Sequence, residues 1–176
     1  MSSTTLVSLE EYLSTSYRPD REYVDGVLLE RNVGTFKHGR LQKLVIVFFE
    51  QFEESQGIEA LPDVRLLVNS ATGRHRVPDV MVLKAPFMKD DVITDVPVVI
   101  VEVKSPDDTM DDLLERCFDY EKMGVRYPLV MDPEHKLIWL FKHGSFQALA
   151  NGAVDLDFGG FTVSFPYTQI WAKLER

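Results

Sequence analysis

Two residues of opposite charge, Glu102 and Lys104, stand one valine apart near the end of a strongly hydrophobic segment, residues 98–106. Apolar side chains at consecutive positions indicate a strand that is covered on both faces. Because side chains alternate along a strand, Glu102 and Lys104 project to one face, and Val101 and Val103 project to the other. A carboxylate and an ammonium group are costly to bury unless each has a partner. We therefore expect further polar groups to converge on this face.

Asp79 is the best candidate for such a group, because it follows Pro78 near the start of a second apolar segment, residues 77–83. Proline is tolerated where a strand begins, since its missing N–H does little harm there. If this strand neighbours the first, the carboxylates of Asp79 and Glu102 can face one divalent cation, with Lys104 beside them. Carboxylate oxygens on a rigid sheet suit Mg²⁺ or Mn²⁺. The two segments together predict a metal site.

The rest of the sequence predicts the helices and strands that position these residues. Ser8 and Glu11 form a capping-box pattern, which predicts a short helix to about residue 14. Asp25-Gly26 between apolar runs predicts a hairpin over residues 22–30. The other expected elements are a helix over 37–55 closed by Gly57, strands at 59–61, 64–68, 77–83 and 98–104, a helix from the acidic segment 107–112 to residue 123, a hairpin of 129–131 and 137–141, strands at 146–149 and 160–165, and a helix over 166–174.

Length and composition predict one globular domain over residues 1–176. The chain is 45% hydrophobic, which is enough for a core of two or three layers. The lone Cys117 excludes an internal disulfide and a cysteine-based zinc cluster, and it favours a reducing compartment. We find no signal-peptide pattern and no apolar run of membrane-spanning length. The prediction is a cytoplasmic protein that does not enter a membrane.

The formal net charge of -9 argues against nucleic-acid binding, which generally calls for clustered lysine and arginine. Total charge is not local potential, because part of the acidic excess would be metal ligands whose charge a cation offsets. Two local basic groups, residues 37–43 and 74–76, offer positive charge close to the predicted site. Nucleic acid therefore stays among the expected partners.

Pro78-Asp79 followed by Glu102-Val103-Lys104 resembles the PD-(D/E)XK motif of restriction-endonuclease-like phosphodiesterases. A wider set of separated segments, in the same order, resembles the Uma-type family of restriction-endonuclease-like proteins within that superfamily. These segments are residues 22–26, His38, 76–80, 101–106, Tyr120, 124–125 and 132–133. The resemblance implies an α/β fold with an αβββαβ core, in which a central mixed sheet is flanked by helices and carries additional β-hairpins. It also implies a divalent-metal site.

The function expected from this resemblance is a metal-dependent endonuclease that hydrolyses phosphodiester bonds, most readily those of DNA. Mg²⁺ or Mn²⁺ would be held by Asp79, Glu102 and the backbone carbonyl of Val103. Lys104 would position the attacking water or stabilise the developing charge. Glu22 would recruit a second ion or orient the nucleophile, and His38 is a further catalytic candidate.

Each role has a plain structural alternative. Asp79 can cap a turn, Glu102 and Lys104 can form a salt bridge, Glu22 can lie exposed on its hairpin, and His38 can be solvated at a helix start. Aromatic side chains at 137–141 and 146–149 suggest a homodimer, although the sheet can also bury them.

Two other functions stay open at this point. One is a catalytically silent protein that keeps the nuclease fold to bind protein or DNA, which the acidic composition favours. The other is a glycosidase that uses Asp79 and Glu102 as its carboxylate pair, which leaves Lys104 unexplained.

Overall fold

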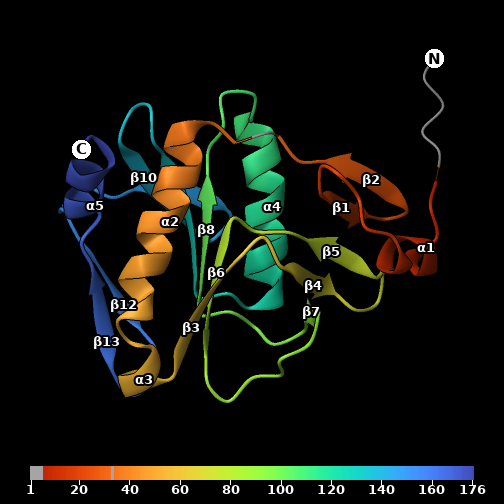
Figure 1. Ribbon diagram of the computed structural model, residues 1–176, viewed down its shortest axis with the longest axis horizontal. Helices are drawn as coiled ribbons and strands as arrows, with labels where there is room; N and C mark the ends of the chain where they lie inside the picture. The colour runs from red at the N-terminus through yellow and green to blue at the C-terminus, as the bar shows by residue number, and fades with distance from the viewer. Residues whose placement is uncertain (1–5, 33) are drawn as a thin grey trace.

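A mixed six-stranded sheet lies at the centre of the computed structural model, which describes residues 6–32 and 34–176 (Figure 1). The strand order is β11-β10-β9-β8-β6-β3. Neighbouring strands run antiparallel except β8 and β9, which are parallel. The members are β3 (Ile58–Pro62), β6 (Val80–Lys84), β8 (Val99–Val103), β9 (Tyr127–Asp132), β10 (Leu137–Lys142) and β11 (Ser145–Ala148).

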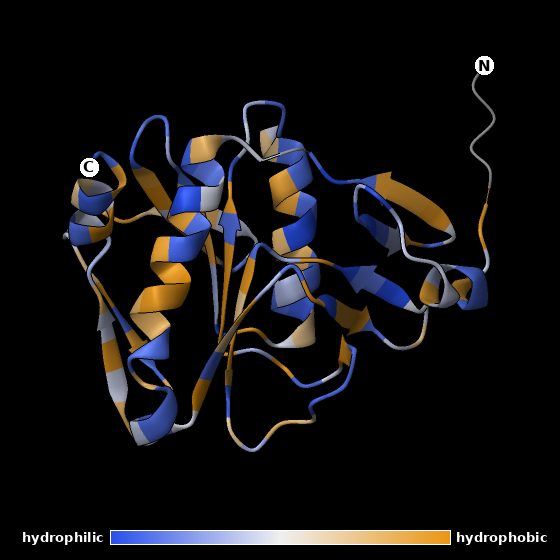
Figure 2. Ribbon diagram, in the orientation of Figure 1, coloured by the Kyte–Doolittle hydropathy of each residue, from blue (hydrophilic) through white to orange (hydrophobic). Residues whose placement is uncertain are grey.

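Helices cover both faces of this sheet, and the alternation of β8 decides which residue meets which helix. Val101 and Val103 belong to the same buried cluster as residues of α2 (Phe36–Glu50) and α5 (Tyr167–Leu174). Ile100 instead packs with Tyr120 of α4 (Met110–Met123). Figure 2 shows the central strands largely in orange and the helices banded in orange and blue, as amphipathic helices require. The order α2-β3-β6-β8-α4-β9 is the expected αβββαβ core, so that prediction is confirmed.

A second sheet of five short strands, ordered β2-β1-β5-β4-β7, stands beside the first near α1 (Leu9–Ser14). Its strands are β1 (Arg21–Val24), β2 (Val27–Glu30), β4 (Arg65–Asn69), β5 (Arg74–Arg76) and β7 (Val92–Ile93). The hairpin predicted over 22–30 is β1 and β2, whose turn places Asp25 and Gly26 at positive φ. We did not predict that these strands form a sheet of their own.

The prediction of a single strand over residues 77–83 is wrong at its start, because β6 begins only at Val80. The chain leaves the second sheet after β5 and enters the central sheet only at β6, so residues 77–79 belong to neither ladder. Pro78 has no N–H to donate to a ladder, which explains why the break falls there. Asp79 therefore lies at the junction between the two sheets.

Two further expectations need correction. The helix predicted over 37–55 is divided into α2 and the short α3 (Glu53–Gln56), with Phe52 in a non-helical conformation between them. Gly57 then ends α3 at a φ of 64°, a left-handed conformation that favours glycine. A small two-stranded sheet of β12 (Val154–Asp157) and β13 (Thr162–Phe165) follows β11, and its first strand was not predicted.

The predicted helix after the acidic segment is α4, and its two ends explain its length. The Thr109 side chain accepts from the N–H of Asp112 while the Asp112 carboxylate accepts from the N–H of Thr109, which satisfies free donors at the start. Gly124 closes the helix at a φ of 103°. Within the described part of the chain, no helix has the length and apolar character needed to cross a bilayer.

Candidate functional site

Asp79 is almost completely buried at the junction between the two sheets, with 4% of its side chain exposed. Its Oδ2 accepts a hydrogen bond of 2.7 Å from the N–H of Val103. Its Oδ1 accepts from Nη2 of Arg31 at 2.5 Å and lies 3.3 Å from Nε2 of His38. Burial acts to raise the pKa of Asp79, but His38, Arg31 and the Val103 N–H outweigh it and hold the pKa below its usual value. Asp79 is thus an ionised carboxylate with donors on both oxygens.

Glu102 lies in β8 on the face that meets α4, and it is also buried. The Tyr120 hydroxyl donates to Oε1 of Glu102 at 2.5 Å, and Nη1 of Arg116 donates to Oε2 at 3.2 Å. Burial and then the charge of Asp79 raise the pKa of Glu102 to about 7. The donors Arg116 and Tyr120 lower the pKa of Glu102, but they do not outweigh its burial and the charge of Asp79.

Asp79 and Glu102 both stand beside the pairing of β6 with β8. Val80 is opposite Val101 in this antiparallel pair, Asp79 directly precedes β6, and Glu102 follows Val101 on β8. The influence of Asp79 on the pKa of Glu102 agrees with this placement.

Lys104 directly follows β8, and 21% of its side chain is exposed. Its Nζ lies 3.9 Å from Oδ2 of Asp132, whereas the ion-pair partner of Glu102 is Arg116. Among the described residues, the alternative of a salt bridge between Glu102 and Lys104 is therefore wrong. Loss of Lys104 would not deprive Glu102 of its charged partner.

Glu22 is buried on β1, so the alternative of an exposed hairpin residue is wrong. Its Oε2 accepts from Nη1 of Arg76 at 2.8 Å, and its Oε1 accepts from the N–H of Val77 at 3.2 Å. The charge of Glu22 also contributes to the raised pKa of Glu102. Glu22 is therefore held in place by two hydrogen bonds, one of them to Val77 in the segment that leads to Asp79, and its charge acts on Glu102.

His38 lies in the first turn of α2, and 12% of its side chain is exposed, so the solvated alternative is also wrong. Its Nδ1 lies 3.0 Å from Oγ of Ser105, and its Nε2 faces Asp79. Burial acts to lower the pKa of His38, but the hydrogen bond and charge of Asp79 outweigh it, so the pKa is raised. The imidazole ring of His38 therefore lies between Ser105 and Asp79 and contacts both.

The sequence did not point to Arg31 or Gln42, which surround Asp79. Arg31 follows β2 and also donates to Oδ1 of Asp63 at 2.6 Å. Gln42 donates to Oδ2 of Asp63 at 2.9 Å and to the backbone carbonyl of Asp79 at 2.8 Å. Gln42 lies one helical turn after His38, a spacing that would have identified it. No local pattern identifies Arg31, whose partner Asp79 is 48 positions further along.

The basic segment 74–76 does not supply positive charge to a substrate as expected. Arg76 is buried and binds Glu22 and Asp119, while His75 is buried beside it. Arg74 pairs with Asp25 and Asp119. The positive charges of Arg74 and Arg76 are thus already paired with carboxylates of the protein.

Two hollows meet at Arg31. One, of about 210 Å³, is lined on its charged side by Glu22, Arg31, Asp108 and Arg116. The other, of about 320 Å³, is lined by Arg31, His38, Gln42 and Asp63. Arg31 therefore lines both hollows while it donates to the buried Asp79.

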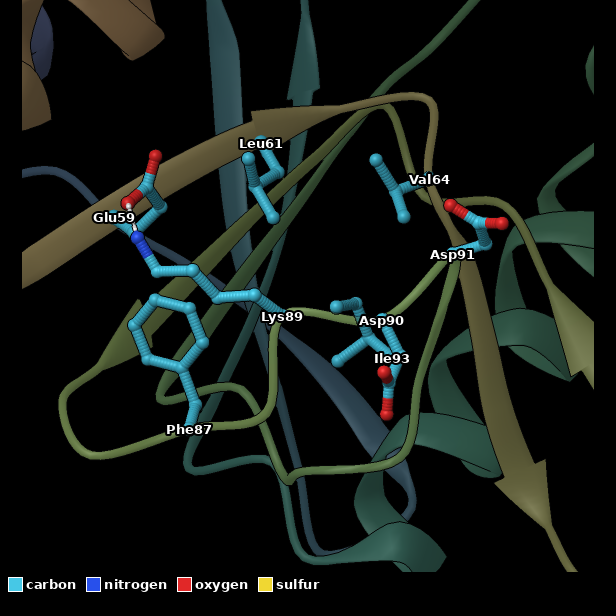
Figure 3. Close-up of a pocket in the computed structure, with 8 residues that line it drawn as sticks. All are labelled: Glu59, Leu61, Val64, Phe87, Lys89, Asp90, Asp91 and Ile93. Atoms are coloured by element: carbon cyan, nitrogen blue, oxygen red, sulfur yellow. Dashed lines mark ion pairs between the residues drawn. The ribbon is translucent and has the colours of Figure 1, made fainter.

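A third hollow of about 350 Å³ lies away from these residues, between β3 and the loop that precedes β7 (Figure 3). Lys89 crosses it, with Nζ 3.9 Å from Oε2 of Glu59 and 5.8 Å from the centre of the Phe87 ring. None of the predicted site residues lines it. Of those residues, Glu22 lines the smaller hollow at Arg31 and His38 lines the larger one, whereas Asp79, Glu102 and Lys104 are not among the lining residues of either.

The donor set around Asp79 and Glu102 suits a hard divalent cation, since it consists of carboxylate oxygens. Burial, and then the charge of Asp79, raise the pKa of Glu102, and a cation bound between the two carboxylates would favour its ionised form. Within residues 6–32 and 34–176, no three histidine, cysteine or acidic side chains form a metal-binding group by themselves. A cation here would rest on the two carboxylates, completed by backbone or solvent oxygens. For Val103, the backbone group in contact with Asp79 is the N–H.

Comparisons with known proteins agree with this architecture. A family model named Uma2, described as "Putative restriction endonuclease", matches residues 9–156. The crystal structure of "a putative nuclease belonging to DUF820" from Anabaena variabilis ATCC 29413 has a TM-score of 0.80 and 16% identity, covering 96% of this chain and 99% of that chain. A DrdV–DNA complex has a TM-score of 0.39 and 14% identity, covering 78% of this chain and 13% of that chain. No curated protein matches the sequence.

Proposed function

We propose that this chain, which belongs to the Uma2 family of restriction-endonuclease-like proteins, is a divalent-cation-dependent endonuclease that cleaves phosphodiester bonds, with DNA as its substrate. The observation that carries the proposal is the position of Asp79 and Glu102. Asp79 directly precedes β6 and Glu102 lies on the neighbouring β8; both are buried, the charge of Asp79 contributes to the raised pKa of Glu102, and Lys104 lies two residues beyond Glu102. Paired carboxylates and a lysine in this order suit metal-assisted hydrolysis.

The residues that would hold Mg²⁺ or Mn²⁺ are Asp79, Glu102 and the backbone carbonyl of Val103. When bound, the cation polarises the scissile phosphate and lowers the pKa of a bound water. Asp79 is suited to this role because its pKa lies below the ordinary value, which keeps it ionised. Tyr120 and Arg116 hold the Glu102 carboxylate in a fixed orientation from α4.

Lys104 would act on the reacting water or on the charge that develops at the phosphate. Its contact with Asp132 is long and its side chain is partly exposed, so the ammonium group can reach a ligand without breaking a buried ion pair. Glu22 would act on the site only through its charge, because both of its carboxylate oxygens already accept hydrogen bonds, from Arg76 and from the N–H of Val77. His38 would orient Asp79 through Nε2, supported on its other side by Ser105.

Cleavage of a supercoiled plasmid tests this function. Wild-type protein should nick or linearise the DNA with Mg²⁺ or Mn²⁺ and lose this activity in EDTA. Asp79→Asn and Glu102→Gln should be inactive, while Glu121→Gln on the far part of α4 should keep wild-type activity. A wild-type protein that binds Mn²⁺ but cleaves neither DNA nor RNA would contradict the nuclease assignment.

A catalytically silent binding protein is the second candidate, and one observation favours it. Arg31 and Arg116 already neutralise Asp79 and Glu102 from within the protein, so the buried carboxylates do not require a metal for charge balance. The acidic net charge of -9 points the same way. The plasmid assay separates the two candidates, because a silent protein gives no cleavage with any cation.

A homodimer is the quaternary state we propose. Its support is that β11 forms one edge of the central sheet and that Leu137 on the adjoining strand is 46% exposed. Phe141, part of the aromatic surface on which the expectation rested, is buried against Phe118 and Phe146. Light scattering at high protein concentration tests the proposal, and a monomer alone would contradict it.

A further inference from the structure

Arg31 bridges two aspartates of different burial. Its Nη1 donates to Oδ1 of Asp63 at 2.6 Å, and its Nη2 donates to Oδ1 of Asp79 at 2.5 Å. Asp63 is an accessible residue with 42% of its side chain exposed, whereas Asp79 is buried. The guanidinium group is always charged, so Arg31 holds a permanent positive charge beside the Asp79 carboxylate.

The position of this charge conflicts with a cation on the same carboxylate. A carboxylate oxygen offers two lone pairs, and Oδ1 of Asp79 already faces both Arg31 and His38. A magnesium ion approaches its oxygen ligands to about 2.0–2.1 Å, and a guanidinium at hydrogen-bond distance from the same oxygen would repel it. One of the two positive charges must move away.

We propose that Arg31 is an internal counter-ion for Asp79 that a divalent cation displaces, so that Arg31 sets how tightly the site binds metal. This inference rests on the proposed function, because it takes Asp79 as a metal ligand. Arg31 can leave Asp79 without losing every partner, since Asp63 still holds its Nη1. Gln42 keeps Asp63 and the backbone of Asp79 in place meanwhile, because its amide donates to both.

The direction in which Arg31 moves is also defined. Its side chain is 19% exposed and lines both hollows beside Asp79. A guanidinium released from Asp79 therefore remains at the mouth of the site and is not forced into the core. In the metal-free protein, Arg31 neutralises the charge of Asp79. In the metal-bound protein, the divalent cation takes the place of the Arg31 guanidinium.

Arg74 provides a matched control within the same chain. It also bridges a buried and an exposed aspartate, Asp119 with 8% and Asp25 with 51% of the side chain exposed. Its own side chain is 22% exposed, close to the value for Arg31. Arg74→Gln thus removes the same charge from a similar bridge that involves neither Asp79 nor Glu102.

Calorimetric titration of Mn²⁺ into full-length protein tests the inference. Arg31→Gln should bind Mn²⁺ about tenfold more tightly than wild type, because the competing charge is gone. Arg74→Gln should bind like wild type, and Asp79→Asn should not bind at this site. This pattern supports the counter-ion role of Arg31.

Other results overturn it in distinguishable ways. If wild type binds through Asp79 but Arg31→Gln binds equally or more weakly, the counter-ion role is wrong while the proposed metal site stands. If Arg31→Gln and Arg74→Gln both bind Mn²⁺ more tightly than wild type by the same factor, the gain comes from the change in net charge alone. That result would also overturn the counter-ion role of Arg31. If neither wild type nor Arg31→Gln binds Mn²⁺, the proposed metal site and the counter-ion role both fall.

A second measurement covers the case in which Arg31→Gln does not fold. Nuclear magnetic resonance of the arginine side chains of wild-type protein, with Arg31 assigned from Arg31→Lys, follows its guanidinium directly. Saturating Mg²⁺ should shift the Arg31 signals and leave those of Arg74 unchanged. Unshifted Arg31 signals in a protein that binds Mg²⁺ at Asp79 would overturn the inference.

Discussion

The N–H of Val103 donates a hydrogen bond of 2.7 Å to Oδ2 of Asp79, joining the end of β8 to the residue before β6. Asp79 lies outside the ladder of both sheets, so this side-chain contact continues the β6–β8 pairing past its last backbone partners. It fixes the Asp79 carboxylate beside the strand that carries Glu102.

Tyr120→Phe should destabilise the protein by about 1–3 kcal/mol, because it removes the buried donor to Oε1 of Glu102 and leaves the shape of the core unchanged. Urea unfolding of both proteins measures the difference. Tyr127→Phe is the control, since its hydroxyl accepts from the N–H of Asp157 at an exposed site. A loss for Tyr120→Phe no larger than for Tyr127→Phe would show that this bond does not support Glu102.

Lys104→Ala should change stability by less than about 1 kcal/mol, because the contact with Asp132 is 3.9 Å long and partly exposed. Its cleavage rate should fall by roughly 100-fold or more if the ammonium group acts on the transition state. Melting curves and plasmid assays on the same preparation measure both effects. A variant that cleaves DNA as fast as wild type would remove Lys104 from the catalytic set.

Arg76→Gln should destabilise the protein by roughly 3–5 kcal/mol, since it leaves Glu22 and Asp119 buried without their shared cation. Arg126→Gln, on an exposed pair with Asp157, should cost at most about 1 kcal/mol. Denaturant unfolding compares the two. Similar losses for both variants would mean that the buried network does not hold Glu22 in place.

Mg²⁺ should raise the melting temperature of wild-type protein and leave that of Asp79→Asn unchanged, because a ligand that binds only the folded state stabilises it. At 100 times the dissociation constant, the gain is about 2.7 kcal/mol. Differential scanning calorimetry in EDTA and in Mg²⁺ measures this. An equal shift in both proteins would place the bound ion away from Asp79.

Much of the fold follows from local signals in the sequence. Ser8 accepts from the N–H of Glu11 at the start of α1, as its capping-box pattern predicts, and Gly124 ends α4 directly after residue 123, the predicted end of that helix. β12 escaped prediction because it contributes only one fully buried side chain, Leu156, between two exposed aspartates. Local patterns identify elements that have caps or a full hydrophobic face, and they miss short ones that depend on a partner strand.

The candidate site was predictable only in part, for a similar reason. Asp79, Glu102 and Lys104 belong to a recognisable motif, and in the structure Asp79 directly precedes β6, the strand that pairs with the β8 of Glu102. The charges that balance them, Arg31 and Arg116, come from distant segments. Lys104 and Glu102 are close in sequence, and a salt bridge between them was the structural alternative, yet each pairs with a different residue. Ion pairing depends on tertiary packing, which the spacing of charges along a strand does not determine.

The position of a bound cation is the most direct test of the central claim that Asp79 and Glu102 form a metal site. Crystals grown with Mn²⁺ should give an anomalous difference peak between the two carboxylates, with the carbonyl oxygen of Val103 as a further ligand. Asp79→Asn crystals under the same conditions should lack the peak. A well-ordered wild-type structure at saturating Mn²⁺ with no peak between these carboxylates would contradict the account.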